Sequence, residues 1–463
     1  MTSVLLIYPF FRPRRDRSRF RFPPLGPAYV AAALREAGHD VELLDCTFLG
    51  HDEAVARARA SGASVVGVSA LATLAPDALW FAERLRGHCD LLVAGGPLPT
   101  CEPGPFLTRF DAVVRGEGEA TMCELVAAVA AGHDPAGLPG VVTRAGAADG
   151  TPAAPASVAP DLALPAPRSR PLAPDLDALP LPARDLLPNA AYIAAARARH
   201  SAAVTTVMTT RGCPFACEFC SNVVFGRTYR ERSPGKVVDE VEQALALGYD
   251  RIAFADDVFT LDRARVRAIC DEIARRDLRF AWECLGRADT VDDEVAGRLR
   301  AAGCDTVFFG LESGNDDVLR LMDKRITTVQ GRAAVAAARR AGLRVGAFFI
   351  LYYPGETDDT VLDTLRFARS LPLDYVGLSM PYPLPGTRLV ERVGRPARQW
   401  CQRGGLLGDH SLLFDAGVSA TRVRAAIVKG QVEHLIGRWF GPLSPLALRA
   451  FAAPTDALLR RVP

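Results

Sequence analysis

The feature that most constrains the fold is an alternation of short apolar runs with amphipathic stretches, which occurs twice along the 463 residues. In the first part of the chain, the apolar runs are SVLLIY (3–8), VELLD (41–45), SVVGVSA (64–70), LLVAGG (91–96) and DAVVRG (111–116). The stretches between them have helical spacing, near residues 26–38, 52–61, 74–88 and 118–132. Strands that alternate with helices predict a parallel, doubly wound sheet, whose ligands bind at the carboxyl ends of the strands.

The same alternation resumes near residue 200. We expect strands near residues 203–209, 250–255, 279–284, 305–310, 344–351 and 374–379. We expect helices near residues 234–247, 261–276, 291–302, 327–341 and 358–370. These strand–helix units predict a partial (β/α)6 barrel with its catalytic groups at the strand ends. The predicted fold class is therefore α/β, with a doubly wound, Rossmann-like domain followed by a partial barrel.

Two further segments complete the predicted organisation. Residues 141–195 are rich in Ala, Pro and Gly without periodicity, which indicates a linker between a first domain at 1–140 and a barrel at 196–387. Its end, DLDALPLPARDLLP (175–188), is more apolar, and we expect it to pack against the fold. Residues 388–463 lose the strand–helix rhythm. We expect this segment to be helical, to close the mouth of the barrel and to shape the substrate pocket.

The composition limits the possible partners. A formal net charge of +2 indicates no strong field for nucleic acid or for an acidic membrane surface. No apolar window of about 18 residues lacks charge, and the start, MTSVLLIYPFF, lacks a basic segment and a cleavage site, so we predict neither a membrane span nor a signal peptide. Eleven cysteines in such a chain indicate a reducing cytoplasm. The basic run at 12–21 is interpreted as a solvated or ligand-covering loop, with a phosphate or RNA contact as the alternative.

Three cysteines stand close together after the first strand of the predicted barrel: Cys213, Cys217 and Cys220. A disulfide framework does not suit a reducing compartment. Structural zinc prefers four ligands, and neither a second CxxC pair nor a nearby His is present. The third possibility is an iron–sulfur cluster held by three thiolates, with one iron left open. Cys401 and His410 are interpreted as structural residues, with an extra cluster ligand and a proton donor as their alternatives.

The CxxxCxxC spacing, with Phe219 directly before the third cysteine, resembles the signature of the radical S-adenosylmethionine (SAM) family. Further stretches that resemble family motifs follow in the expected order: FADDVFT (254–260), WECLGRAD (282–289), FFGLESG (308–314), LYYPGET (351–357) and PYPLPGT (381–387). The resemblance implies a [4Fe-4S] cluster whose open iron binds SAM. It also implies cleavage of SAM to a 5′-deoxyadenosyl radical that abstracts hydrogen from a substrate.

The resemblance implies several SAM contacts in the first half of the barrel. Phe219 would shield the cluster and pack near adenine. Asp256 and Asp257 end the second strand, where the family binds the amino group of SAM. Arg287 would offer a bidentate fork to the SAM carboxylate, and a surface salt bridge is its alternative role.

Four residues in the second half of the barrel complete the implied SAM site. Glu312 and Ser313 would bind the ribose hydroxyls and the methionine amine, with a helix N-cap as the alternative. Ile350 would touch adenine, with an ordinary buried strand residue as the alternative. Tyr352 departs from the family pattern, because we expect Gly there to permit close backbone approach. Its role, in the adenine pocket, the substrate pocket or the core, stays open.

The first domain resembles the cobalamin-binding domain of cobalamin-dependent radical SAM enzymes. The matching stretches are PPLGPAYVAAALREAGHDVELLD (23–45), VVGVSA (65–70), VAGGPLPT (93–100) and VVRGEGE (113–119). The expected cobalamin contacts are Ser69, Thr73, Gly95, Gly96, Pro97, Gly116 and Glu117. A strand-end turn and a helix cap are the alternatives for the glycine pair and for Ser69. No Asp-x-His-x-x-Gly follows the first strand, so we expect no histidine ligand to cobalt from this loop. The lower face of cobalamin is then left to water or covered by an apolar or Arg side chain, for which residues 8–25 are the candidates.

The resemblance predicts an enzyme, a cobalamin-dependent radical SAM methyltransferase. One SAM would methylate cobalamin and a second would supply the radical, so that an unactivated carbon, or phosphorus, of a specialised metabolite takes the methyl group. The alternative keeps the cofactors but catalyses cyclisation, ring contraction or oxidation without net methyl transfer. A methylthiotransferase is disfavoured, because it would need a second cysteine triad in the first domain, where the cysteines are scattered. A non-catalytic sensor is disfavoured, because it would not need the SAM motifs. The expected partners are a small-molecule substrate and an external electron donor of the flavodoxin or ferredoxin type.

Overall fold

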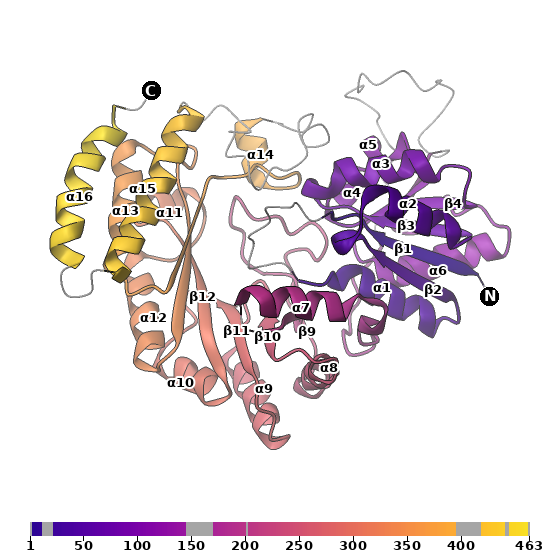
Figure 1. The fold of residues 1–463 in the computed structure, drawn as a ribbon, viewed down its shortest axis with the longest axis horizontal. Coiled ribbons are helices and arrows are strands. Elements are labelled where there is room, and N and C mark those ends of the chain that lie inside the picture. The colour runs from indigo at the N-terminus through magenta and orange to yellow at the C-terminus, as the bar shows by residue number, and fades with distance from the viewer. Residues whose placement is uncertain are drawn as a thin grey trace.

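The computed structural model describes residues 2–11, 22–144, 170–200, 202–394, 418–439 and 444–461. Two bodies, each built on one large sheet, lie side by side in Figure 1. No helix within the described ranges is long and apolar enough to cross a membrane. Cys401, His410 and the basic run at 12–21 lie outside the described residues.

The first body contains a six-stranded sheet in the order β2-β1-β3-β4-β5-β6. The strands are β1 (Ser3–Tyr8), β2 (Asp40–Asp45), β3 (Val65–Ser69), β4 (Leu91–Gly95), β5 (Ala112–Val114) and β6 (Val141–Thr143). The helices are α1 (Leu25–Glu36), α2 (His51–Ala60), α3 (Ala75–Leu85), α4 (Pro97–Cys101), α5 (Pro103–Leu107) and α6 (Gly118–Ala130). Alternate residues of β1 face opposite sides of the sheet: Leu5 and Ile7 pack with α2 and α3, whereas Val4 and Leu6 pack with α1 and α6. The predicted doubly wound sheet is confirmed.

The segment predicted as a linker, 141–195, is structured at both ends. β6 adds an antiparallel edge strand to β5, and α7 (Asn189–His200) leads into the second body. A turn at Gly140, with φ of 82°, separates β5 and α6 from β6 without a further helix, so the strand–helix rhythm does not reveal this strand. Arg184, in the apolar stretch at 175–188, is 1% exposed, so this stretch packs against the fold as expected. β6 and α7 show that residues 141–143 and 189–195 are regular structure, not linker.

The second body contains a six-stranded parallel sheet in the order β14-β13-β12-β11-β10-β7. The strands are β7 (Val204–Val207), β10 (Arg251–Phe254), β11 (Ala281–Gly286), β12 (Cys304–Glu312), β13 (Arg344–Ile350) and β14 (Tyr375–Ser379). The helices are α8 (Pro234–Ala246), α9 (Arg263–Arg275), α10 (Asp293–Ala301), α11 (Asp316–Leu321), α12 (Thr328–Arg340) and α13 (Asp358–Ser370). The strands follow one another in chain order, and the sheet remains open between β14 and β7, as an open partial barrel requires. The predicted partial barrel is confirmed.

The first predicted barrel strand, 203–209, differs in detail. It ends as β7 at Val207, and the chain then forms the short strand β8 (Thr210–Arg211), which pairs antiparallel with β9 (Arg230–Glu231). The β8–β9 hairpin encloses the segment 212–229, which carries the three clustered cysteines. We call this segment the cysteine loop.

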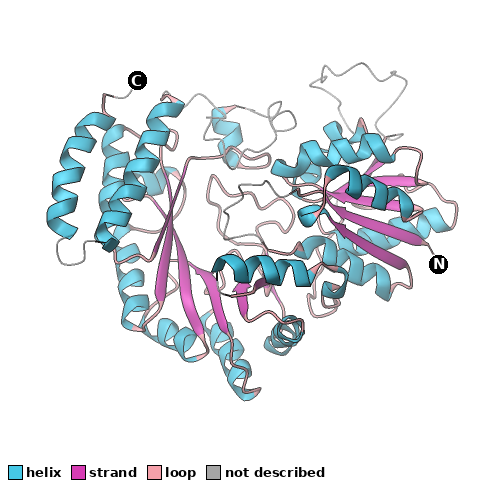
Figure 2. Cartoon of the chain, in the orientation of Figure 1, coloured by secondary structure: helices cyan, strands magenta, loops and turns pink. Residues whose placement is uncertain are grey.

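The C-terminal segment consists of α14 (Arg388–Val393), α15 (Ala420–Trp439) and α16 (Ser444–Leu459) in the described ranges. α15 covers the edge strand β14: the Gln431 amide donates to the Val376 carbonyl at 3.1 Å, and Arg438 donates to the Asp374 carbonyl at 2.7 Å. α15 and α16 thus lie beside the barrel, next to α13 and away from the first body (Figure 2). These two helices therefore do not close the barrel mouth, contrary to the prediction for the segment. They cover β14 instead, because an edge strand needs partners for its backbone groups.

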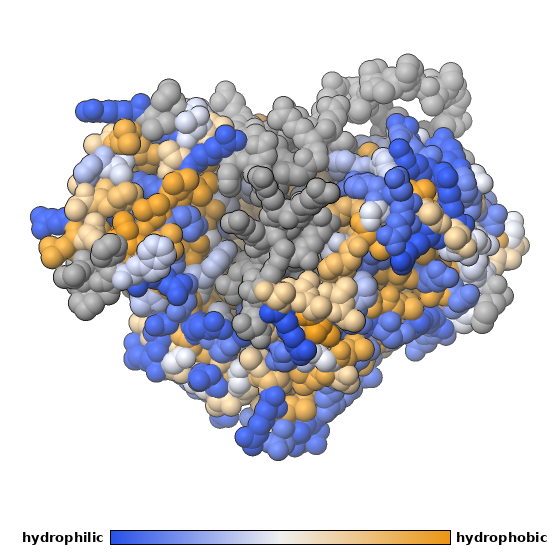
Figure 3. Space-filling model, in the orientation of Figure 1, coloured by the Kyte–Doolittle hydropathy of each residue, from blue (hydrophilic) through white to orange (hydrophobic). Residues whose placement is uncertain are grey.

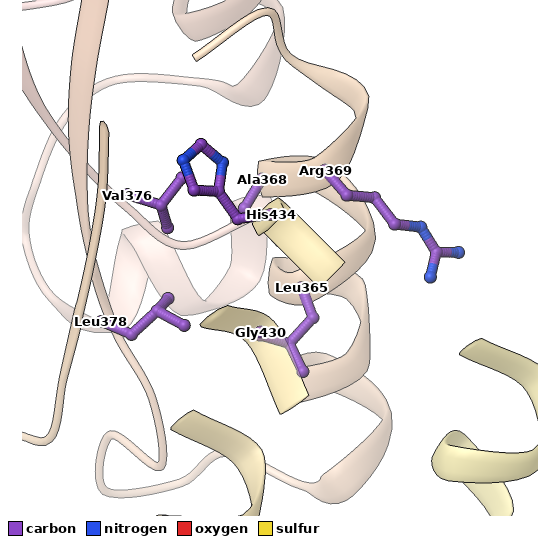
Figure 4. Close-up of a pocket in the computed structure, with 7 residues that line it drawn as sticks. All are labelled: Leu365, Ala368, Arg369, Val376, Leu378, Gly430 and His434. Atoms are coloured by element: carbon purple, nitrogen blue, oxygen red, sulfur yellow. The ribbon is translucent and has the colours of Figure 1, made fainter. Parts of the chain in front are cut away.

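The contact between α13, β14 and α15 is close-packed. A Cβ added to Gly430 would lie 2.4 Å from a methyl carbon of Leu378, so only glycine lets α15 approach the strand this closely. The remaining gap, shown in Figure 4, has a volume of about 10 Å³, too small to hold a ligand. Figure 3 shows apolar residues on the surface where α15 lies. Val428 and Leu435, both within α15, are exposed.

Candidate active site

The cysteine loop brings three thiols together at the end of the barrel that faces the first body. Cys213 and Cys217 are buried and Cys220 is half-buried. Burial, with further contributions from the charges of Asp257 and of the other two thiolates, raises the pKa of Cys220 to about 12. Thiols in such surroundings ionise when a cation binds them. No three His, Cys, Asp or Glu side chains among the described residues converge on the position of a single metal ion.

The cysteine loop is anchored to three other segments of the second body. The Glu218 N–H donates to the Met322 carbonyl at 2.9 Å, and the Leu389 N–H donates to the Glu218 carbonyl at 3.0 Å. The Glu218 carboxylate accepts from the Tyr353 hydroxyl and from Arg392, the latter at 3.0 Å. These contacts fix the middle of the loop, between Cys217 and Cys220, against the end of α11, the segment after β13 and α14.

Gly212 begins the loop in the left-handed region, with φ of 87°. A Cβ there would lie 2.4 Å from the Thr228 carbonyl oxygen, so the two ends of the loop approach each other more closely than any other residue permits. The glycine of the RGC sequence is therefore required where the two ends of the loop meet. We call this place, at the β8–β9 hairpin, the neck of the cysteine loop.

The two predicted aspartates at the end of β10 have different surroundings. The Asp256 carboxylate is buried and accepts from the backbone N–H of Thr209 at 2.6 Å, from that of Thr210 at 2.9 Å and from the Thr209 hydroxyl. Asp256 therefore holds the link between β7 and β8. Asp257 is exposed, and its charge raises the pKa of the Cys213 and Cys220 thiols after the larger effect of burial, so it lies beside the thiols.

Arg287, at the end of β11, is 3% exposed and already engaged. Its guanidinium donates to the backbone carbonyls of Lys324 and Arg325, the second at 3.1 Å, and pairs with Asp289 at 2.8 Å. It also lies 3.8 Å from the ring centre of Phe215 in the cysteine loop. The alternative role as a surface salt bridge is wrong, because the side chain is buried, and much of the fork predicted for a carboxylate serves the protein itself.

Sequence reasoning missed Lys324, whose ammonium donates to the Glu312 carboxylate at 2.9 Å. Glu312 ends β12 with a φ of 62°, and a Cβ on Gly310 would lie 2.5 Å from its carboxylate oxygen and 2.9 Å from the Lys324 nitrogen. Burial alone lowers the pKa of Lys324, but Glu312 and Cys217 more than offset it. The ammonium lies 5.7 Å from the Phe219 ring centre. The one feature of the sequence that could have singled out Lys324 is the rarity of lysine, which occurs only at positions 236, 324 and 429.

The other predicted residues of this half divide between an apolar wall and the core. Ile350 belongs to a buried cluster with Val318, Met322, Tyr353 and Leu389, and Phe219 packs against it. The Ser313 hydroxyl is buried, lies 3.0 Å from the Thr364 hydroxyl and accepts from the Asn315 N–H at 3.1 Å. Its contacts are therefore those of a local cap.

Tyr352 adopts a φ of 58°, the left-handed conformation that glycine takes most easily and that the expected family pattern would place there. Its ring packs in a cluster with Leu362, Met380 and Val423, and its hydroxyl donates to Asp358 at 3.2 Å. Of the roles left open, the packing favours the core contact with α15.

Glu356, in the LYYPGET stretch, titrates unusually. Its carboxylate accepts from the Tyr353 N–H at 2.7 Å, and burial raises its pKa to about 7 from the ordinary 4.5. A folded state that binds a proton more tightly than the unfolded chain loses stability as pH rises. The loss develops between about pH 4.5 and pH 7 and is complete above that range.

Glu356→Gln is expected to remove this loss. Because the side chain keeps some solvent contact, the difference in unfolding free energy between pH 5 and pH 8 should shrink by roughly 1–2 kcal/mol relative to the unaltered chain. Urea unfolding at both pH values measures it, with the exposed Glu391→Gln as the control. An unchanged pH dependence in Glu356→Gln would show that the folded carboxyl group titrates normally.

The carboxyl ends of β3, β4 and β5 form an open edge on the first body. The hydroxyls of Ser69 and of Thr73, in the 3-10 turn Ala72–Leu74, are half-buried and make no hydrogen bond to another described residue. A Cβ on Gly95 would meet nothing nearer than the Val114 carbonyl at 3.9 Å, and one on Gly116 would meet nothing within 4 Å. Hydroxyls that have no partner among the described residues and lie beside open space are suited to hold a large polar ligand.

Gly96 and Pro97 have a different role in this edge. Gly96 has a φ of 106°, and a Cβ there would lie 2.9 Å from the Ala70 carbonyl oxygen, so the glycine is needed for close contact with the end of β3. Pro97 begins α4. Within α4, the Thr100 hydroxyl donates to the Gly96 carbonyl at 2.8 Å and accepts from the Gly116 N–H at 3.0 Å. The β4 and β5 loops are therefore joined.

Glu117 does not belong to the open edge. Its carboxylate is 7% exposed and accepts from two arginines of the second body, Arg211 and Arg230. The prediction of a free cobalamin contact at Glu117 is at odds with this arrangement, because the side chain is already paired.

The open edge and the cysteine loop face each other where the two bodies meet. Gly386, of the PYPLPGT stretch, lies against α4 of the first body: a Cβ added there would be 3.3 Å from the Cys101 sulfur. The Cys101 thiol lies 3.5 Å from the Pro385 carbonyl. The strand ends of both sheets therefore border one region, seen between the two bodies in Figure 1.

Two family models match the chain: the B12 binding domain at residues 12–126 and the radical SAM superfamily at residues 207–368. The chain is 34% identical to an uncharacterized methyltransferase of Pyrococcus horikoshii, over 80% of this chain and 78% of the relative. It is 29% identical to the anaerobic magnesium-protoporphyrin IX monomethyl ester cyclase of Rubrivivax gelatinosus, over 84% of this chain and 70% of the relative.

A solved structure shares the fold. It is the radical SAM methyltransferase TsrM from Kitasatospora setae, determined with cobalamin and a [4Fe-4S] cluster, with a TM-score of 0.68 and 22% identity over 85% of this chain and 74% of that one. The chain therefore belongs to the cobalamin-dependent radical SAM methyltransferase family. The predicted family, enzyme class and cofactors (an iron–sulfur cluster, SAM and cobalamin) are confirmed at the level of the family.

Proposed function

We propose that the protein transfers a methyl group from SAM to an unactivated carbon, or to phosphorus, of a small molecule. The observation that supports the proposal is that the three thiols of the cysteine loop and the open edge after β3, β4 and β5 border one region between the bodies. Relatives named as methyltransferases support this reaction over the other reactions of the family.

The residues divide the work between the two cofactor sites. Cys213, Cys217 and Cys220 would hold the cluster, whereas Ser69, Thr73 and the open backbone at Gly95 and Gly116 would hold cobalamin. When bound, these cofactors supply a radical that removes a hydrogen atom and a methyl group that takes its place.

The walls of the SAM site come from the barrel. The apolar wall of Phe219 and Ile350 excludes water and offers a face for an aromatic base. Lys324 and Asp257 place opposite charges near the thiols, suited to the carboxylate and the ammonium of an amino acid. Arg287 holds the turn that carries Lys324, through hydrogen bonds to the carbonyls of Lys324 and Arg325, instead of binding the SAM carboxylate directly.

Lys324→Met is expected to weaken SAM binding without loss of iron. A charge-assisted hydrogen bond contributes about 1.5–3 kcal/mol, which corresponds to a rise in Kd of roughly ten- to a hundredfold. Anaerobic equilibrium dialysis with labelled SAM measures the Kd, and the exposed Lys236→Met is the matched control. If both variants bind SAM equally well, Lys324 serves Glu312 alone.

A second reaction is favoured by a specific observation, the similarity to magnesium-protoporphyrin ester cyclases over most of the chain. A cyclase or oxidase with this architecture would use the same two edges without net methyl transfer. Formation of S-adenosylhomocysteine distinguishes the reactions, because methyl transfer from SAM leaves it as the second product.

The experiment uses the full chain reconstituted anaerobically with iron, sulfide and hydroxocobalamin, then supplied with deuteromethyl SAM, a low-potential flavodoxin or ferredoxin and a small-molecule extract. Mass spectrometry should find 5′-deoxyadenosine, S-adenosylhomocysteine and a labelled small molecule. A changed small molecule without label and without S-adenosylhomocysteine would replace methyl transfer by cyclisation or oxidation. Failure to retain cobalamin after desalting would overturn the proposal for the first body.

A further inference from the structure

The neck of the cysteine loop carries two arginines that face each other. In the β8–β9 hairpin, Arg211 and Arg230 are direct cross-strand partners. Like charges directly opposite each other destabilise such a pair, and the effect is larger away from water. Arg211 is 5% exposed and the side chain of Arg230 is 12% exposed. The hairpin therefore needs negative charge from another part of the molecule.

The first body supplies that charge from the start of α6. Arg211 donates to Glu117 at 2.8 Å through one terminal nitrogen and to Glu119 at 2.5 Å through the other. Arg230 donates to both oxygens of Glu117, each at 3.0 Å. The four groups balance in charge, and both carboxylates are less than 10% exposed.

Further contacts hold this ion cluster in place. The Glu117 carboxylate also accepts from the Ala173 N–H at 2.7 Å, and Arg230 donates to the Ala173 carbonyl at 2.7 Å. The Arg211 guanidinium lies 5.3 Å from the ring centre of Tyr29 in α1 and 5.2 Å from that of Phe225 in the cysteine loop. Aromatic rings on two sides add cation–π attraction and exclude water.

The carboxylates are also tied to the open edge of the first sheet. Glu117 directly follows Gly116, whose N–H donates to the Thr100 hydroxyl, and that hydroxyl donates to the Gly96 carbonyl. A ligand that orders the strand-end loops therefore orders the backbone that carries Glu117. At the other end, Arg211 is two residues before Cys213.

We propose that Glu117 and Glu119 are positioning residues through which the first body clamps the neck of the cysteine loop, so that ligand binding at the open edge orders the loop that carries the thiols. The proposal rests on the proposed function for the identity of that ligand, cobalamin. It gives Glu117 and Glu119 a role across the two bodies, in place of a cobalamin contact.

Hydrogen exchange measured by mass spectrometry on the full chain, with and without hydroxocobalamin, tests the clamp. The variant is Glu119→Gln, which removes one charge and keeps the shape. The matched control is Glu283→Gln, which breaks another buried arginine pair of the barrel, with Arg251 at 2.8 Å, at the opposite ends of the strands. Arg230→Lys, which keeps its charge, is the second variant if Glu119→Gln does not fold.

In the unaltered chain, hydroxocobalamin should slow exchange both in the first body, at residues 66–120, and in the cysteine loop. In Glu119→Gln, exchange in the cysteine loop should rise about tenfold or more, and hydroxocobalamin should protect residues 66–120 alone. Glu283→Gln should keep both responses. If Arg230→Lys has to replace Glu119→Gln, exchange in the cysteine loop should still be faster than in Glu283→Gln, because lysine cannot make both hydrogen bonds of Arg230 to Glu117.

Two results would overturn the clamp: exchange in the cysteine loop equal in Glu119→Gln and Glu283→Gln, or protection of the loop by hydroxocobalamin in Glu119→Gln. A different failure concerns the proposed function. If hydroxocobalamin protects no peptide of residues 66–120 in the unaltered chain, the cobalamin assignment is wrong. The clamp is then decided by the comparison of the two variants without ligand.

Discussion

Cys217→Ala is expected to lose the iron–sulfur cluster and with it all cleavage of SAM, while the chain keeps its fold and its cobalamin. Three thiolates are needed to hold the cluster, and the loss of one leaves a second iron without a protein ligand. The rate of 5′-deoxyadenosine formation should fall by at least about a thousandfold, because the chemistry belongs to the cofactor. Iron and sulfide analysis after anaerobic reconstitution, with cobalamin measured by absorbance, checks both parts.

The matched control is Cys270→Ala, in the buried face of α9, where the thiol packs with apolar neighbours of the barrel core. This variant removes a buried sulfur without touching the cysteine loop, so iron content and SAM cleavage should match those of the unaltered chain. If Cys217→Ala retained full iron and turnover, the cysteine loop would not be the cluster site. Loss of cobalamin in the same variant would indicate that the two sites depend on each other.

The sheets could be predicted because buried parallel strands leave a direct record in the sequence. Each expected strand of both bodies appears, since a strand buried on both faces requires a continuous apolar run, such as FFGLE or VGAFFI. The short strands β8 and β9 leave no such record. Their hairpin carries the ion cluster at Arg211, β8 is followed by Gly212, and neither feature gives an apolar pattern.

Site residues were predictable where their motif alone determines the chemistry, as for the three cysteines. The roles of charged residues were not, because a sequence does not show which partner a charge finds. Arg287 and Glu117 look like ligand contacts in their motifs, yet the fold pairs both with other parts of the chain. Lys324 shows the opposite case. It lies outside the motifs that resemble the family, yet the turn after α11 brings it to Glu312 and Phe219.

Arg184, in the connecting segment between the two bodies, is another charged residue whose partners the sequence does not show. Arg184 is 1% exposed, and its guanidinium donates to the Glu240 carboxylate of α8 at 2.6 Å and to the Thr206 carbonyl at 2.6 Å. The second oxygen of Glu240 accepts from the Tyr29 hydroxyl of α1 at 2.6 Å. One carboxylate that is fully buried thus joins the first body, the connecting segment and the barrel.

Glu240→Ala is expected to destabilise the chain by about 3–5 kcal/mol, because it leaves the buried charge of Arg184 without its partner. Glu242→Ala is the matched control on the same helix: its carboxylate pairs with Arg276 at 2.7 Å and is 45% exposed, so its removal should cost about 0–1 kcal/mol. Chemical unfolding followed by circular dichroism measures both.

The informative quantity is the difference between the losses of unfolding free energy in Glu240→Ala and in Glu242→Ala. Equal losses would mean that the Arg184–Glu240 pair is hydrated in solution and that the connecting segment is not held by it. A large loss confined to Glu240→Ala would show that the connecting segment fixes the first body on the barrel through one buried charge. The two cofactor edges can face each other only while that attachment holds, so the same variant should also lower turnover at temperatures where each body remains folded.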